Sequence, residues 1–412
     1  MSNGQAKQTK NYCVKISVLW YIPYCVFVFS RIILNTEFVY SNPSFTTLVI
    51  RLAHVLIIGC CLMKLVLEKR VNIKQFLLVI VLGIGVICSI VGNYEVILYS
   101  VILIIFSYKT DFKITIKCLI ATQLFGLIFT FFMCKIGVIR DLIYMHLFSL
   151  TTSNGIRVHS FGFSYYTMPA YLILAIMMEY FFLRGKAKLI EIFVWGVIQY
   201  LTYRTFTSRG TFYMAILFIF LYTLFCYIPF GDKIKRFLLW FGRFGFFIMC
   251  LVNVILVRLS SIGNTKINSL NNLLNGRFDI VNKMILQYGI HLWPQQIIIR
   301  GAYEVFYTNS TEYSYIDSGY LYSLICYGVI FTITILFIYT IIYMNSYQNN
   351  NKLIMVWMLT YMIMNINNNM LFSLQYCPLL ILLPQVLNKK QHNIMKIRIK
   401  IKNSYHNSTL LN

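Results

Sequence analysis

The residues of this chain that are best suited to chemistry are five arginines, which lie in two long polar segments and in one short turn. An arginine guanidinium is planar, stays charged in poor solvent and binds phosphate oxygens in pairs. The set consists of Arg157, Arg204, Arg209, Arg277 and Arg300. Very few carboxylates accompany them, so we expect this part of the protein to bind an anion such as a pyrophosphate.

Aromatic side chains accompany the arginines in the second polar segment. The C–H faces of sugar rings stack on such side chains, and the candidates for sugar binding are Trp293, Tyr320 and Tyr322. Structural roles stay open for several of these residues. An alternative role for Arg204 and Arg209 is to extend their charged ends to the membrane interface. For the tyrosines, the alternative is an interfacial belt or core packing. His159 likewise fits a hydrogen-bonded loop residue.

The elements that hold these residues belong to a membrane protein. The chain has 412 residues, of which 59% are hydrophobic and 12% are charged. Soluble domains carry about 25% charged residues, so the composition excludes soluble enzymes, disordered proteins and nucleic-acid binders. We therefore expect an all-α polytopic integral membrane protein, with one membrane domain over residues 1–412 and no nucleic-acid partner.

Apolar runs long enough to cross a bilayer recur along the whole chain. A helix needs about 20 apolar residues to span the hydrocarbon core, or slightly fewer when the span is short. The runs predict about twelve transmembrane helices, and the last two are separated only by an asparagine-rich stretch. The predicted passes are 16–34, 46–66, 75–92, 94–108, 117–138, 167–183, 189–203, 210–229, 237–257, 318–343, 353–370 and 371–388.

Basic residues alternate between the two sides of the membrane. The net charge is +24, and with a cytoplasmic N-terminus nearly every short cytoplasmic loop is basic, as is usual for membrane proteins. The pattern predicts a cytoplasmic C-terminus and a basic tail, 389–412, that meets anionic membrane lipids. It also predicts two long extracytoplasmic loops, 139–166 and 258–317. Arginines on this side run against the charge rule, which suggests a functional reason for their presence.

Several motifs of common enzymes are missing from the sequence. There is no glycine-rich phosphate loop, which makes nucleotide hydrolysis a poor candidate, and no HExxH metal site. There is also no DxD-like carboxylate pair to hold a metal-bound nucleotide sugar. A donor that carries its own activated leaving group needs neither a metal nor a cofactor, so we expect none.

At these residues the chain resembles the Wzy-type oligosaccharide repeat-unit polymerases of bacterial capsule and O-antigen synthesis. The resemblance covers most of the chain as topology, although the Arg-x10-Gly loop motifs of some members have no clear counterpart. It implies a GT-C-like glycosyltransferase architecture. The short elements that carry it are Arg157…Ser160-Phe161-Gly162-Phe163, Arg204…Ser208-Arg209-Gly210, Asn275-Gly276-Arg277, and Asp317…Tyr320-Leu321 followed by Tyr327-Gly328.

The resemblance implies a multi-pass enzyme of the bacterial cytoplasmic membrane. It would transfer the growing glycan from undecaprenyl pyrophosphate onto a new lipid-linked repeat unit at the outer face. The five arginines would bind the departing pyrophosphate, and Arg277 would stabilise its developing charge. Either His159 or Asp317 would act as the base for the acceptor hydroxyl. A flippase and a chain-length regulator are candidate protein partners.

Three alternatives stay open at this point. A ligase-like glycan transferase would share the architecture and the pyrophosphate site but use a different acceptor. A lipid-linked oligosaccharide flippase or similar transporter would need a charged central cavity and repeat symmetry, and no repeat is visible between the two halves. A membrane acyltransferase would need a histidine with an acidic partner, and His159 has none nearby in sequence.

Overall fold

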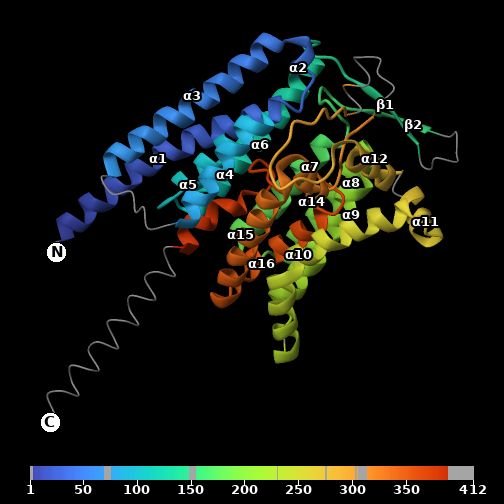
Figure 1. Cartoon of the computed structure of the whole chain (residues 1–412). Coiled ribbons are helices and arrows are strands. Elements are labelled where there is room, and N and C mark those ends of the chain that lie inside the picture. The colour runs from blue at the N-terminus through green and yellow to red at the C-terminus, as the bar shows by residue number, and fades with distance from the viewer. Residues whose placement is uncertain are drawn as a thin grey trace.

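The computed structural model describes residues 3–68, 76–147, 155–229, 231–273, 276–301, 304 and 313–387, and these are mostly helical (Figure 1). The predicted tail 389–412 and Asn275 lie outside the described residues. Figure 1 shows α1 and α3 running side by side. The elements before the first long loop are α1 (Asn3–Ile33), α2 (Phe38–Ser41), α3 (Pro43–Glu68), α4 (Phe76–Gly92), α5 (Glu95–Phe106) and α6 (Phe112–Lys135).

The part of the chain that follows α6 contains the residues that the sequence suggests for the site. A β-hairpin comes first, and short helices fill much of the second long loop. These elements are β1 (Ile143–Leu147), β2 (Gly155–His159), α7 (Met168–Arg184), α8 (Leu189–Phe206), α9 (Arg209–Tyr227), α10 (Asp232–Ser261), α11 (Thr265–Leu273), α12 (Arg277–Tyr288), α14 (Gly319–Tyr322), the π-helix η1 (Ser323–Tyr327), α15 (Gly328–Gln348), α16 (Lys352–Met364) and the 3-10 helix η2 (Pro378–Leu382).

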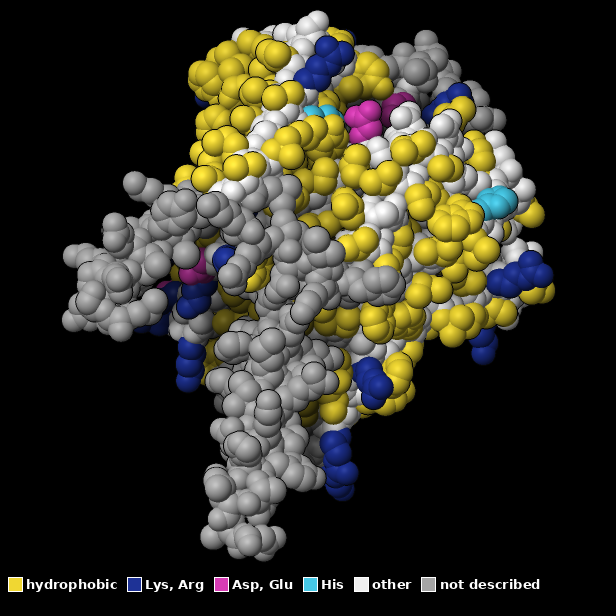
Figure 2. Space-filling model, turned by 60° about the vertical axis from the view of Figure 1, so that its left-hand side comes forward, with side chains coloured by type: hydrophobic (Ala, Val, Ile, Leu, Met, Phe, Trp, Pro, Cys, Tyr) yellow, Lys and Arg dark blue, Asp and Glu magenta, His cyan; other side chains and the backbone are white. Residues whose placement is uncertain are grey.

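The helices have the lengths and the exposed apolar surfaces of a membrane protein, which confirms the predicted class of an all-α membrane protein. Among the described residues, five helices are long and apolar enough to cross a bilayer. On the face shown in Figure 2, hydrophobic side chains form a broad surface, and lysine and arginine side chains lie mainly at its margins. On α3, for example, Leu48, Val55 and Val66 are each at least 65% exposed. The twelve passes and their orientation stay a prediction. The five helical spans are Pro43–Lys64, Phe112–Lys135, Arg209–Tyr227, Arg236–Ser261 and Gly319–Gln348.

The last two predicted passes differ from the structure. Helix α16 ends at Met364, and turns occupy most of the chain from there to η2. Asparagine side chains cap the end of the helix. Asn365 Nδ2 donates to the carbonyl of Tyr361 (2.7 Å) beside the helical bond from the Asn365 N–H (3.1 Å), and Asn368 Nδ2 donates to the carbonyl of Met364 (3.1 Å). A continuing helix would instead bond the Met364 carbonyl to the N–H of Asn368. The predicted pass 371–388 therefore begins in irregular backbone.

A close backbone contact joins the start of α14 to this asparagine turn. The N–H of Gly319 donates to the carbonyls of Asn365 (3.0 Å) and Asn368 (3.1 Å). A Cβ atom at position 319 would lie only 2.5 Å from Asn365 Oδ1 and 2.9 Å from the Asn368 carbonyl. Only glycine allows the two segments to approach so closely, and this contact places Asp317 beside the turn.

We expect Gly319→Ala to destabilise the protein, because the added methyl group must displace backbone. Overpacking of this kind costs about 1–3 kcal/mol in the free energy of unfolding. Thermal unfolding of the purified protein in detergent measures the effect as a lower Tm. Gly59→Ala in α3 is the control, since a Cβ there meets nothing within 4 Å. Equal Tm values for the two variants would contradict the close approach.

The π-helix η1 fixes the loop that follows α12. Just after η1, the N–H of Val329 donates a hydrogen bond to the carbonyl of His291 (3.0 Å). Gln295 Nε2 donates to the carbonyl of Ile325 (2.9 Å). Gly328 has a φ of 84°, and a Cβ there would lie 2.7 Å from the loop backbone. π-helices are rare and often occur at functional sites, so this loop belongs to the candidate functional region.

Candidate functional site

An ion pair between two sequence-predicted residues forms the centre of the candidate site. Arg277 is the first residue of α12, and Asp317 lies two residues before α14. Their side chains meet with Arg277 Nε 3.1 Å from Asp317 Oδ2, and they are 35% and 22% exposed. The pair is thus accessible to a ligand while most of its surface is covered by protein.

The asparagine turn after α16 provides the second support for Arg277. Arg277 Nη1 donates to the side-chain oxygen of Asn367 and to its backbone carbonyl, the latter at 3.2 Å. The neighbouring Asn368 accepts a hydrogen bond from the hydroxyl of Tyr171 on α7. The guanidinium is therefore held by a carboxylate on one side and by a turn on the other, so its fork has a fixed direction.

Tyrosines surround the ion pair. The hydroxyl of Tyr165 donates to that of Tyr166 across 3.3 Å, and their ring centres are 4.4 Å apart. Tyr313 and Tyr315, just before Asp317, lie within electrostatic reach of its carboxylate, as do Tyr165 and Tyr166. Tyr166 is buried, whereas Tyr313 is exposed. Hydroxyl groups and aromatic faces beside a charged pair suit a ligand that has both hydroxyls and C–H faces.

Burial changes the proton affinities at the site. It raises the pKa of Asp317, and the charge of Arg277 opposes this rise without cancelling it. Burial lowers the pKa of Arg277, but Asp317 and the neighbouring tyrosines together outweigh burial, so this pKa lies above its usual value. Burial also raises the pKa of Tyr315 to about 12, with the charge of Asp317 adding to it. The tyrosines are therefore neutral hydrogen-bonding groups, and Asp317 is a stronger base than a solvent-exposed aspartate.

The other four predicted arginines lie in different elements. Arg209 begins α9, and its charge reaches the hydroxyl of Tyr166, which the Arg277–Asp317 pair also reaches. Arg204 is exposed in the last turn of α8, and Arg157 is exposed on β2. The backbone of Arg300 bonds to Ser314, which joins two stretches in the last third of the second long loop. The structure thus gathers Arg277 and Asp317, with Arg209 at the periphery.

His159 has an acidic partner that is distant in sequence. It lies at the end of β2, where Ile143 is its partner in β1. Its Nδ1 is 2.6 Å from Oδ2 of Asp141, and the other oxygen of Asp141 accepts from the N–H of Phe161 at 2.8 Å. The two side chains are 50% and 30% exposed. Asp141 therefore orients the ring and leaves Nε2 for another partner, as in a histidine that acts as a base.

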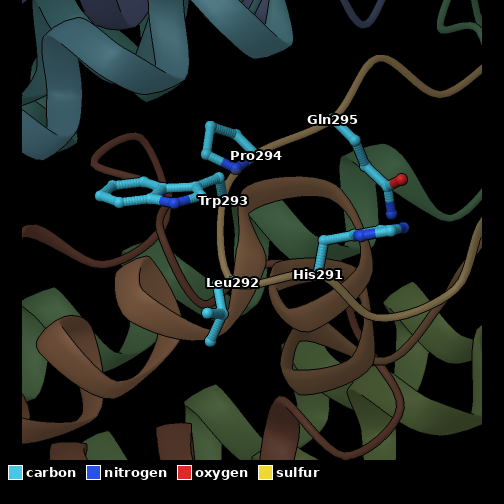
Figure 3. A pocket seen from close by; sticks show the side chains of 5 residues that line it. All are labelled: His291, Leu292, Trp293, Pro294 and Gln295. Carbon is cyan, nitrogen blue, oxygen red and sulfur yellow. The ribbon is translucent and has the colours of Figure 1, made fainter.

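The three aromatic candidates occupy different environments. Tyr320 is fully buried and donates to the carbonyl of Met362 (2.8 Å), so its contacts are with the core. Tyr322 packs edge-on against Tyr327, with ring centres 5.4 Å apart. Trp293 is 51% exposed and lines a cavity of about 450 Å³ together with its neighbours in the loop. Figure 3 shows Trp293 on one side of this loop and His291 with Gln295 on the other.

No family model, no curated protein and no solved structure matches this chain. The residues of the site are therefore the basis for assigning a function.

Sequence reasoning missed the uncharged part of the site and one carboxylate, Asp141. Asn367, Asn368 and Tyr171 contact the ion pair or its supports, and Asp141 was missed because it lies 18 residues from His159. One signal was present: residues 365–369 contain four asparagines between two apolar runs. Polar carboxamides in such surroundings need partners, and here the partners belong to the site.

Proposed function

We propose that the chain is a glycan polymerase, which joins lipid-linked oligosaccharide repeat units at the outer face of the bacterial cytoplasmic membrane. The observation that carries the proposal is the Arg277–Asp317 pair, surrounded by tyrosines and held by the asparagine turn. An arginine fork matches the oxygens of a pyrophosphate, and the hydroxyl-rich surroundings match a sugar. The apolar helices of the chain match a polyprenyl chain.

Each group of the site has a role in such a transfer. The acceptor hydroxyl of a new repeat unit attacks the anomeric carbon of the growing glycan, and the bond from that carbon to pyrophosphate breaks. Arg277 stabilises the negative charge that develops on the leaving undecaprenyl pyrophosphate. Asp317 accepts the hydroxyl proton through Oδ1, since its Oδ2 contacts Arg277.

The surrounding groups position the two sugars. Tyr166 and Tyr315, with neutral hydroxyls, donate and accept hydrogen bonds, and Tyr313 offers an exposed ring for stacking. Trp293, which lines the cavity in the loop, is available to a more distant sugar of the same chain. Arg209 adds positive charge toward the leaving group, because its field reaches Tyr166 beside the ion pair.

A strain that lacks the gene tests this function directly. We expect its surface glycan to contain single repeat units in place of a ladder of long chains, and the plasmid-borne gene to restore the ladder. Gel electrophoresis of extracted glycan gives both readings. Full-length polymer that stays on its lipid would instead indicate a ligase. Units that remain on the cytoplasmic leaflet would indicate a transporter, and either result would contradict polymerisation.

A further inference from the structure

A second polar cluster lies inside the helix bundle, away from the ion pair. Gln123 of α6 and Glu179 of α7 are fully buried, and Gln375 of the irregular segment after α16 is 6% exposed. Gln123 Nε2 donates to Glu179 Oε1 (2.9 Å) and to the backbone carbonyl of Gln375 (2.7 Å). Two polar side chains and a backbone carbonyl therefore meet where apolar packing is the rule, and such groups in a membrane interior usually have a function.

The cluster has more acceptors than donors. Glu179 Oε2, Gln123 Oε1 and Gln375 Oε1 are buried, and none has a hydrogen-bond partner among the described residues. The orientation of Gln123 is fixed by its two bonds, because turning the amide would direct its oxygen at two other acceptors. The unpartnered atoms of Gln123 and Glu179 are thus oxygens, which need either a hydrogen-bond donor or a cation.

The charge of Glu179 is also unbalanced. Glu179 takes no part in the ion pairs Arg140–Glu37, His159–Asp141, Arg184–Glu191 and Arg277–Asp317. The titratable groups within its electrostatic reach are Tyr24 of α1 and Cys377, which carry no positive charge in any protonation state. A buried carboxylate without a counter-charge is costly, so Glu179 either takes up a proton or binds a cation from outside the chain.

We propose that Gln123, Glu179 and Gln375 form a binding site for one monovalent cation, with Na⁺ as the occupant and H⁺ as its competitor. Hard cations take carboxylate and carbonyl oxygens as ligands, and these residues offer one carboxylate, the carboxamide oxygen of Gln123 and the backbone carbonyl of Gln375, which matches a single positive charge. A proton on Glu179 supplies one donor and satisfies one neighbouring acceptor, whereas Na⁺ contacts several oxygens at once. Irregular backbone beside such clusters supplies further carbonyl ligands in other membrane proteins.

The position of the cluster links it to the candidate site. Gln375 precedes Tyr376, whose ring lies 6.4 Å from that of Tyr171, and Tyr171 donates to Asn368 in the turn that holds Arg277. A bound cation joins α6, α7 and this segment, and we expect it to stabilise the turn. The inference stands independently of the polymerase proposal, because it uses none of the catalytic groups.

Direct binding of ²²Na⁺ to the purified full-length protein tests the site. We expect saturable binding of one Na⁺ per chain, and a Tm that rises in NaCl relative to choline chloride at equal ionic strength, because a ligand that binds only the folded state stabilises it. Glu179→Gln keeps the size of the side chain but removes its charge, so both effects are expected to disappear. The control is Glu191→Gln, which removes a carboxylate that pairs with Arg184 on the surface.

Three results would overturn the sodium site. They are absence of ²²Na⁺ binding to the wild type, unchanged binding in Glu179→Gln, and a Tm that responds to pH but not to Na⁺, which would identify a proton-only site. If Glu179→Gln fails to fold, the pH dependence of ²²Na⁺ binding to the wild type tests the site. Its ²²Na⁺ binding is then expected to fall as the pH is lowered, because protons compete for Glu179, and pH-independent binding would contradict the assignment.

Discussion

Replacing Arg277 by alanine is expected to abolish glycan extension while the protein still reaches the membrane. Arg277 is the one sequence-predicted arginine whose guanidinium joins both Asp317 and the asparagine turn, so its direction is fixed before substrate binds. Loss of one such preorganised donor reduces a rate by roughly 100- to 1,000-fold. The glycan ladder of a complemented deletion strain should collapse to single units, with protein abundance checked on an immunoblot.

Two further variants separate the geometry of Arg277 from its charge. Arg277→Lys keeps the positive charge but loses the planar fork that reaches Asp317 and Asn367 together, so we expect a large loss with this variant as well. Arg258→Ala removes an exposed arginine from the last turn of α10 and should leave the ladder intact. Long chains from Arg277→Ala at normal abundance would exclude Arg277 from the mechanism.

Asp317→Asn is expected to produce the second large loss. The variant preserves the size of the side chain but removes the base, and general-base catalysis contributes roughly 100- to 10,000-fold to a rate. A base works in its ionised form, so the wild-type rate should fall as the pH drops through the pKa of Asp317. Burial raises this pKa, so the acidic limb should lie above the ordinary aspartate value of about 4.

His159→Ala is the informative comparison, because His159 is the other candidate base. Its ring is oriented by Asp141 on the exposed hairpin, whereas Asp317 contacts the proposed pyrophosphate-binding arginine directly. We therefore expect His159→Ala to retain chain extension and Asp317→Asn to lose it, as measured by chain length on the same gel. The reverse result would assign the base to His159 and leave Asp317 as the partner that orients Arg277.

The general class of the fold could be predicted from the sequence because it depends on composition. A chain with 59% hydrophobic residues has to expose apolar side chains, and α3 does so along its length. The ends of helices were harder to predict. Between Met364 and Pro378 the backbone is held by asparagine side chains and by the glycine at 319, and these contacts join segments that hydropathy treats separately.

The candidate site could be predicted only in its charged members. Arg277 and Asp317 stood out because charges are rare on this side of the predicted topology, but their pairing across 40 residues depends on how α12 and α14 pack. The carboxamides and tyrosines that support them resemble ordinary turn and packing residues when read along the chain. Tyr320 is the opposite case. The sequence suggested it for sugar binding, but it is buried and its hydroxyl donates to the carbonyl of Met362.

The most direct measurement is transfer by the purified protein in lipid nanodiscs. The substrate is the lipid-linked repeat unit extracted from the deletion strain, and the readings are glycan length and released undecaprenyl pyrophosphate. With the wild type we predict longer glycans and one released lipid pyrophosphate for every unit added, and with Arg277→Ala we predict neither. Extension without release of lipid pyrophosphate, or equal extension by the two proteins, would contradict transfer at the Arg277–Asp317 site.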